Sequence, residues 1–244
     1  LEQVAGRPRR PYVSASGPAA RAILALEPAA WWRLDEFAGP HAADASGRHR
    51  DAVYEREVTY YLEGPCSDAF CGAGTKNRAA HFAGGRLRAR LPEIGDHYTV
   101  SLWLWNGMPN DGRDFSGWFF SRGPDQGLGL RGDHLGIGGR GGHTGRLVFV
   151  HGDRPEPVAA GRTEIPRWTW HHVAFVRDGA AVRAYLNGRL EFEARSPADG
   201  PGAEGFFFFG GRCDNDSNWE GRLDEIAVFD RALSESRVRK LQAK

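Results

Sequence analysis

The sequence predicts an all-β protein, a jelly-roll sandwich of two antiparallel sheets with short helices near both ends. Three observations lead to this prediction. The chain is rich in turn formers, with 33 Gly and 14 Pro among 244 residues. Many short segments alternate apolar and polar side chains, which is the period of a strand. Asp-Gly and Asn-Gly pairs separate several of these segments, as in tight hairpins.

The composition excludes several classes of protein. The formal net charge is +1, which gives no reason to expect a nucleic-acid partner or a charged membrane surface. No apolar run reaches the ~18 residues that a transmembrane helix needs. Hydrophobic residues make up 41% and aromatics 11%, so the chain has ample material for a core and does not resemble a disordered protein.

The first segment differs from the rest. Residues 1–18, which include the Arg-Pro-rich run 7–11, are predicted to be a linker or tail, and residues 19–244 the folded domain. Residues 19–26 are good helix formers and stop before Pro28. The chain begins at Leu1 without an apolar signal region, and basic residues are almost all Arg. We therefore expect a piece of a larger bacterial protein.

The strongest single strand is predicted over residues 98–105. Tyr98, Val100, Leu102 and Leu104 fall on one face, and the other face also carries apolar groups, which indicates a central strand covered on both sides. Further strands are predicted at 79–82, 86–91, 118–122, 128–131, 147–151, 206–209 and 222–229. The glycine-rich run 136–142 lacks a following Lys-Ser/Thr pair and is assigned to turns.

Residues 168–194 form the clearest supersecondary unit. Three alternating segments are separated by Asp178-Gly179 and Asn187-Gly188, pairs that supply the positive φ of two-residue hairpin loops. The prediction is a three-stranded antiparallel meander. A short helix is expected over 234–242, with Ser234 as cap and a basic last turn.

The three cysteines have different surroundings. Cys66 and Cys71 close a short loop, and Cys213 stands far away. This spacing is a weak zinc signal, so we expect a Cys66–Cys71 disulfide. A disulfide favours an oxidising location, that is secreted, periplasmic or at the cell surface.

Several segments together resemble a known family. Residues 23–36 and 43–48 are similar to the opening of LamG-like, concanavalin A-like jelly-roll domains, which include laminin G and pentraxin-type sandwiches. Trp168–Phe175 resembles that family's Trp-x-His-Val-Ala strand, 185–188 its Tyr-hydrophobic-Asn-Gly turn, and 220–234 its closing strand and helix cap. The order is that of the family over about residues 19–243. Fold alone does not decide function.

The resemblance implies a calcium ion, which in this family often joins the early Asp-x-Ser-Gly loop to the last strand. Carried over to this sequence, it implicates the side chains of Asp44 and Asp224, with carbonyl oxygens from the turn Gly47–His49. Such a mixed set of oxygen ligands suits Ca²⁺. The alternative makes Asp44 a turn residue and Asp224 an ion-pair or cap partner.

A ligand site is predicted around the acidic loop that precedes the last strand. Its candidates are Trp118, Asp214, Asp216, Asn218 and Trp219. The loop has the spacing of an EF-hand start, but Trp219 occupies the position that needs Gly and no flanking helices are predicted. Polar groups beside an aromatic plane suit a sugar. The alternatives are a solvated turn and tryptophans that fill the core.

No catalytic motif is found. His171 and His172 are adjacent on a strand, so they point to opposite faces. The Glu-x-Asp-x-x-Glu pattern of sandwich glycosidases and a Gly-x-Ser-x-Gly elbow are missing. We expect a non-catalytic extracellular module that binds a polysaccharide or glycan. The alternatives are a structural or adhesion domain that contacts protein, including other domains of its chain, and, less favoured, a glycan hydrolase or lyase.

Overall fold

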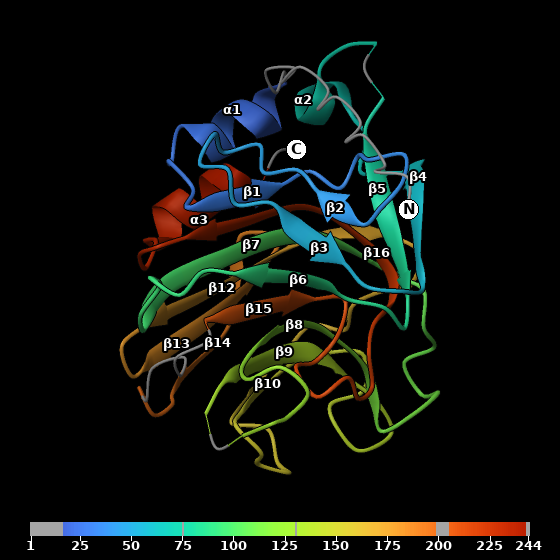
Figure 1. Ribbon diagram of the computed structural model, residues 1–244. Helices are drawn as coiled ribbons and strands as arrows, with labels where there is room; N and C mark the ends of the chain where they lie inside the picture. The colour runs from blue at the N-terminus through green and yellow to red at the C-terminus, as the bar shows by residue number, and fades with distance from the viewer. Residues whose placement is uncertain (1–16, 75, 130, 199–204, 243–244) are drawn as a thin grey trace, which may run out of the picture.

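The computed structural model describes residues 17–74, 76–129, 131–198 and 205–242. Its strands form two eight-stranded sheets that lie face to face, and three short helices lie against one of them (Figure 1). Every strand pair is antiparallel. The predicted jelly-roll sandwich is confirmed. Apart from its last two residues, the linker or tail predicted for residues 1–18 lies outside the described residues.

Sheet A contains the central strand and the meander. Its strands are, in spatial order, β14 (Arg189–Arg195), β13 (Ala181–Leu186), β12 (Trp170–Asp178), β7 (His97–Asn106), β16 (Glu220–Phe229), β5 (Arg78–Ala83) and β4 (Val58–Glu63), with β1 (Ala30–Trp32) paired to β16. The predicted strand 98–105 is thus central, between β12 and β16.

Sheet B carries the aromatic strands β8 and β15. Its order is β11 (Ala159–Ala160), β10 (Leu147–His151), β9 (Asp133–Gly138), β8 (Phe115–Arg122), β15 (Phe206–Phe209), β6 (Leu87–Arg90), β3 (Ala52–Tyr54) and β2 (His41–Ala42). The first and last parts of the chain lie side by side in sheet A, where β1 pairs with β16.

The core lies between the two sheets and is largely aromatic. Tyr98 and Phe175 from sheet A meet Phe120, Phe149 and Phe207 from sheet B, with ring centroids 5.2–6.4 Å apart. Burying one such side chain contributes about 1.5–3 kcal/mol, so alternation along each strand fixes which face turns inward.

The meander has the second turn that its sequence predicts, at Asn187-Gly188, whereas the first loop is shifted by one residue to Gly179-Ala180, because Asp178 belongs to β12 and pairs with Ala181. Gly179 has φ 58° in the loop between β12 and β13, and Asn187 and Gly188 have φ 48° and 72° between β13 and β14. Positive φ at both loop positions is the type I′ geometry that Asn-Gly favours.

The helices α1 (Pro18–Leu24), α2 (Asp68–Cys71) and α3 (Glu235–Leu241) pack on the outer face of sheet A. Ser234 precedes α3 as predicted, but its hydroxyl makes no capping hydrogen bond; it lies 3.1 Å from the hydroxyl of Ser236 instead. Within the described part of the chain, no helix combines the length and apolarity needed to cross a membrane.

Two local predictions are wrong. The described residues of the segment 128–131 form a loop rather than a strand, because its glycines carry the chain around the end of sheet B, with φ 63° at Gly129. Residues 136–138 belong to β9 rather than to a turn. Gly136 lies opposite Trp118, and a Cβ there would be 2.8 Å from the indole, so the strand needs glycine for packing.

A buried ion cluster lies where β9 meets β12. Asp133 accepts hydrogen bonds from Tyr98 Oη at 2.5 Å and from Arg177 Nε at 2.5 Å, and His151 Nδ1 lies 3.0 Å from its carboxylate. These hydrogen bonds and the Arg177 charge outweigh desolvation and hold the pKa of Asp133 far below its usual range. The cluster ties the two sheets together.

Candidate functional site

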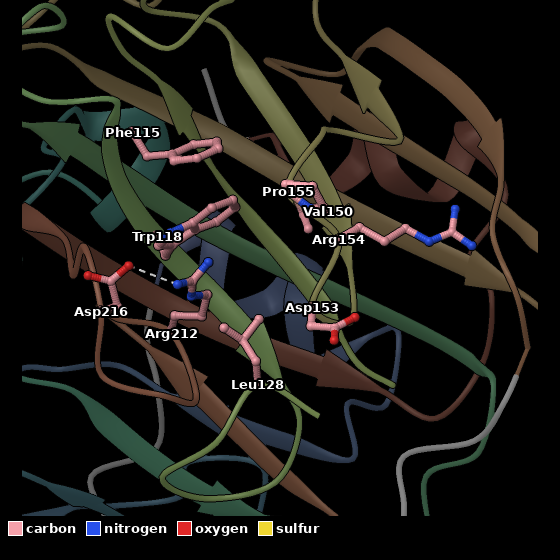
Figure 2. A pocket seen from close by; sticks show the side chains of 9 residues that line it. All are labelled: Phe115, Trp118, Leu128, Val150, Asp153, Arg154, Pro155, Arg212 and Asp216. Carbon is pink, nitrogen blue, oxygen red and sulfur yellow. Dashed lines mark hydrogen bonds and ion pairs between the residues drawn. The ribbon is translucent and has the colours of Figure 1, made fainter. Parts of the chain in front are cut away.

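The first hollow lies on the outer face of sheet B and measures about 250 Å³. Figure 2 shows Phe115 and Trp118 as neighbours on one strand, with Arg212 and Asp216 on one side and the loop 153–155 on the other. The strand is β8, and the loops come from the ends of β10 and β15. Three segments that are distant in the sequence therefore build one site.

Two irregularities in β8 shape the floor of this hollow. Register shifts in β8 between Phe115 and Gly117, and between Trp118 and Phe120, interrupt its alternation. As a result Phe119 and Phe120 both join the core, while Trp118 packs with Val148 and Val150 on the outer face. Phe115 lies beside the indole, with centroids 4.7 Å apart.

Arg212 covers the indole. Its guanidinium carbon lies 5.2 Å from the centre of the Trp118 ring. The guanidinium also pairs with Asp214 at 2.8 Å and with Asp216 at 2.8 Å. Trp118 is consequently 0% exposed, whereas Phe115, Arg212 and Asp216 each keep some exposed surface. The buried Trp118 Nε1 has no hydrogen-bond partner.

The loop 212–219 also borders a second hollow, of about 350 Å³ and lined mainly by polar groups. Asn218 lines it but is occupied structurally. Its Oδ1 accepts from the backbone N–H of Arg212 at 3.0 Å, and its Nδ2 donates to Gly84 O and to Asn215 Oδ1, both at 2.6 Å. Trp219 is 0% exposed and packs on Phe119 in the core.

The five predicted ligand residues thus have different positions. Trp118 and Asp216 meet in the first hollow, and Asn218 and Trp219 border the second. Asp214 lines neither and holds Arg212. Sequence reasoning missed Phe115, which the irregularity in β8 brings beside Trp118. It also missed Arg212 and the loop 153–155, which only the tertiary structure brings to the hollow. The available signal was the spacing of Arg212 and Asp214, which places the two side chains close enough for an ion pair.

Two serine–histidine pairs are buried rather than poised for catalysis. Ser121 Oγ lies 2.8 Å from His134 Nδ1, and Ser101 Oγ lies 2.8 Å from His172 Nε2. Desolvation by burial lowers the pKa of each histidine to about 4. His172 shares the outer face of sheet A with Trp103, and His171 faces the other way with Leu104, as the sequence predicted.

The carboxylate of Asp44 is fully engaged by its own loop. Oδ1 accepts from the backbone N–H of Trp31 at 3.0 Å and of Ser46 at 2.9 Å; Oδ2 accepts from Ser46 Oγ at 2.8 Å and from the N–H of Arg50 at 2.9 Å. These four bonds occupy the sites of an ionised carboxylate. Gly47 and His49 lie in the exposed turn that it closes.

Asp224 has a different environment and shares no hydrogen-bond partner with Asp44. It is 0% exposed; Asn77 Nδ2 donates to its Oδ2 at 2.5 Å, and its Oδ1 has no partner. Desolvation, followed by the charge of Glu225, raises the pKa of Asp224 well above its usual value. Of the two expected calcium aspartates, Asp44 has no carboxylate oxygen left for a cation, whereas Asp224 keeps one buried oxygen without a hydrogen-bond partner. The described residues hold no cluster of three or more His, Cys, Asp or Glu side chains arranged for a metal.

Cys66 and Cys71 lie together at α2. Their Sγ atoms are 3.5 Å apart, within hydrogen-bond contact, whereas a disulfide requires about 2.05 Å. The disulfide therefore stays a prediction. Cys213 is buried, its thiol donates to Gly127 O at 3.1 Å, and burial raises its pKa.

Comparison with known families and structures agrees with this architecture. The family model described as the concanavalin A-like lectin/glucanases superfamily matches residues 83–239, more than half of the chain. The comparison with curated protein sequences gave no significant match.

Solved structures of low sequence identity share the fold. Domain 4 of AbnA, a GH43 extracellular arabinanase from Geobacillus stearothermophilus solved with arabinotriose, is 22% identical with a TM-score of 0.66, over 89% of this chain and 98% of that one. The ligand-binding domain of botulinum neurotoxin serotype D, solved with N-acetylneuraminic acid, is 14% identical with a TM-score of 0.63. This alignment covers 91% of the present chain, which spans about half of the neurotoxin domain (52%).

Proposed function

Because the chain belongs to the concanavalin A-like lectin/glucanases superfamily, we propose that it is a non-catalytic carbohydrate-binding module. The observation that carries the proposal is the first hollow, where an aromatic floor meets planar polar side chains. Sugars present both apolar ring faces and hydroxyl groups, and pockets of this composition bind such ligands. The carbohydrate ligands of the two similar structures support the same ligand class.

The environment of the carboxylates supports binding rather than catalysis. Glycosidases use two carboxyl groups, one of which stays protonated through burial. Asp153 and Asp216 line the hollow, but the first is exposed, and the second is 67% exposed and paired with Arg212. The buried carboxyls of Asp224 and Glu225 border neither hollow.

The test is a glycan array followed by calorimetry with the best ligand. Phe115→Ala should weaken binding by about tenfold or more, because the floor loses its accessible aromatic face. The matched control is Phe37→Ala, which removes an aromatic ring that is 60% exposed outside the hollow. Silence on all glycans and polysaccharides would overturn the proposal and favour a scaffold that contacts protein. If Phe115→Ala and Phe37→Ala lost the same amount of affinity, the first hollow would not be the binding site.

A calcium ion at Asp224 is a second, separate part of the proposal. The buried Oδ1 without a partner supports it, since a cation would compensate this carboxyl. Glu225 is not needed for the site, because its oxygens already accept from Trp31 Nε1 and from Arg33. Excess calcium should raise the melting temperature relative to a chelator. Asp224→Asn should abolish this calcium-dependent rise in melting temperature. Asp44→Asn should lower the melting temperature in both conditions and retain the rise. An unchanged melting temperature in the wild type would refute the calcium site.

Location follows as an expectation from the same comparison. Domain 4 of the arabinanase belongs to an extracellular enzyme. The match covers 98% of that domain and 89% of the present chain. We expect this chain to be a module of a larger secreted, periplasmic or cell-surface protein.

A further inference from the structure

A second surface, on the opposite sheet, carries aromatic and cationic side chains that the proposed site does not use. In five adjacent strands of sheet A, from β4 to β12, one residue of each strand lies directly opposite one residue of the next, so that the five form a row across the sheet. The row, called here the outer row, consists of Thr59, His81, Arg222, Trp105 and Trp170. With strands about 4.8 Å apart, it spans roughly 19 Å.

The outer row faces away from the core. Leu104 and Leu223, which alternate with Trp105 and Arg222, lie in the core between the sheets, so the row points outward. Thr59 is exposed, and the four other members are partly exposed.

The helices cover the rest of this face. The apolar clusters of α1, α2 and α3 take in Trp103 and Ala174, on the same outer face, but no member of the outer row. Among the described residues, this end of the sheet is therefore left uncovered.

Two guanidinium groups stack on indoles at the row. Arg222 lies 4.7 Å from the ring of Trp105, and Arg167 lies 4.3 Å from the ring of Trp168, which is 62% exposed. Arg167 Nη2 donates to Gly107 O at 2.6 Å, which places this second pair at the end of β7, two residues past Trp105.

The charges of these arginines are not compensated by ion pairs. Arg222 Nη1 donates to the carbonyl of Glu63 at 2.8 Å, and Arg167 Nη2 likewise donates to a carbonyl, that of Gly107. In the described part of the chain neither guanidinium has a carboxylate within ion-pair distance. The Nε of each is buried without a partner. The surface is thus aromatic and carries two guanidinium groups without a carboxylate partner, with the exposed carboxylate of Glu220 two residues from Arg222 at its margin beside His81.

We infer that the outer row, with Arg167 and Trp168, binds an acidic polysaccharide, one built from uronic acid units. Indole faces pack against the apolar faces of sugar rings, and a guanidinium that stacks on an indole still presents N–H donors to a carboxylate. Charge complementarity selects an acidic chain over a neutral one. A protein partner would need about 1,000 Å² of contact, and the helices bound this strip.

Binding of polygalacturonate, measured by calorimetry and by affinity electrophoresis, tests the inference. The double variant Arg167→Gln/Arg222→Gln should weaken binding by about tenfold or more, because hydrogen bonds between charged groups are lost. Trp168→Ala should also weaken it, and its exposed position protects the fold. The control Arg48→Gln/Arg140→Gln removes the same charge from two exposed arginines elsewhere.

Circular dichroism confirms that each variant is folded. The inference is overturned if wild-type protein does not bind polygalacturonate, if the double variant binds as tightly as wild type, or if the control loses as much affinity. Phe115→Ala should leave polygalacturonate binding unchanged, while it weakens binding of the glycan that occupies the first hollow. The two surfaces can therefore fail separately.

Discussion

Lowering the pH from 7 to 5 is predicted to destabilise the fold through His172. Its ring is buried between β12 and β7, with Nε2 held by Ser101 and Nδ1 without a partner. Trp103 packs beside it at 5.5 Å. Burial lowers the pKa of His172 to about 4, because a charged imidazole would be desolvated there.

The sign and size follow from the two pKa values. In the unfolded chain a histidine titrates near pH 6.5, about 2.5 pH units higher, and each unit corresponds to about 1.36 kcal/mol. The unfolded chain therefore takes up the proton first, so stability is full above pH ~6.5 and falls as the pH drops toward ~4. At pH 5 the loss from this one ring is about 2 kcal/mol.

Urea unfolding at pH 7 and pH 5 measures the effect against His172→Gln. The glutamine amide can still bond to Ser101 and cannot titrate, so wild type should lose about 2 kcal/mol more than the variant between the two pH values. The raised pKa values of Asp224 and Glu225 act with the opposite sign, but both proteins share them and they cancel. The exposed His143→Gln is the matched control. Parallel pH profiles of wild type and His172→Gln would refute the reasoning.

Three further outcomes are expected. Asp133→Asn leaves the Arg177 charge buried without a carboxylate and should cost about 3–5 kcal/mol in denaturant unfolding; a loss below about 1 kcal/mol would show that the cluster is not coupled. Gly136→Ala puts a methyl group 2.8 Å from the Trp118 ring and should cost about 1–3 kcal/mol with a changed tryptophan fluorescence spectrum, whereas an unchanged spectrum would contradict the packing. Under oxidising conditions the 66–71 loop should close, so that titration of denatured, unreduced protein detects a single thiol; three thiols would exclude the disulfide.

Local patterns predicted much of sheet A. The Asn187-Gly188 turn and the alternation around it define the meander, because both depend only on neighbouring residues. The same holds for β7, whose two apolar faces mark it as central. Sheet B was harder to predict, since the bulges in β8 break the alternation on which strand reasoning depends.

The candidate site was predictable only in part. Trp118 and Asp216 stand out as an aromatic and an acidic residue of the right chemistry, and the structure brings both to the first hollow. Of their neighbours there, Phe115 lies on the same strand as Trp118, whereas the loop 153–155 comes from a distant part of the chain. Trp219 has the same chemistry as Trp118 but fills the core, because its side chain points inward from the residue just before β16. Composition does not distinguish the two tryptophans.

Hairpin turns, strand alternation and the order of motifs are properties of short segments, and for this chain they already specify an antiparallel sandwich. Binding surfaces are properties of register between segments far apart in the chain. Trp105 meets Arg222 only because β7 pairs with β16 in one particular register, and a shift of either strand by one residue would turn its own side chain into the core and separate the two. Burial of the apolar faces selects that register, so the tertiary structure alone decides which surface side chains lie together.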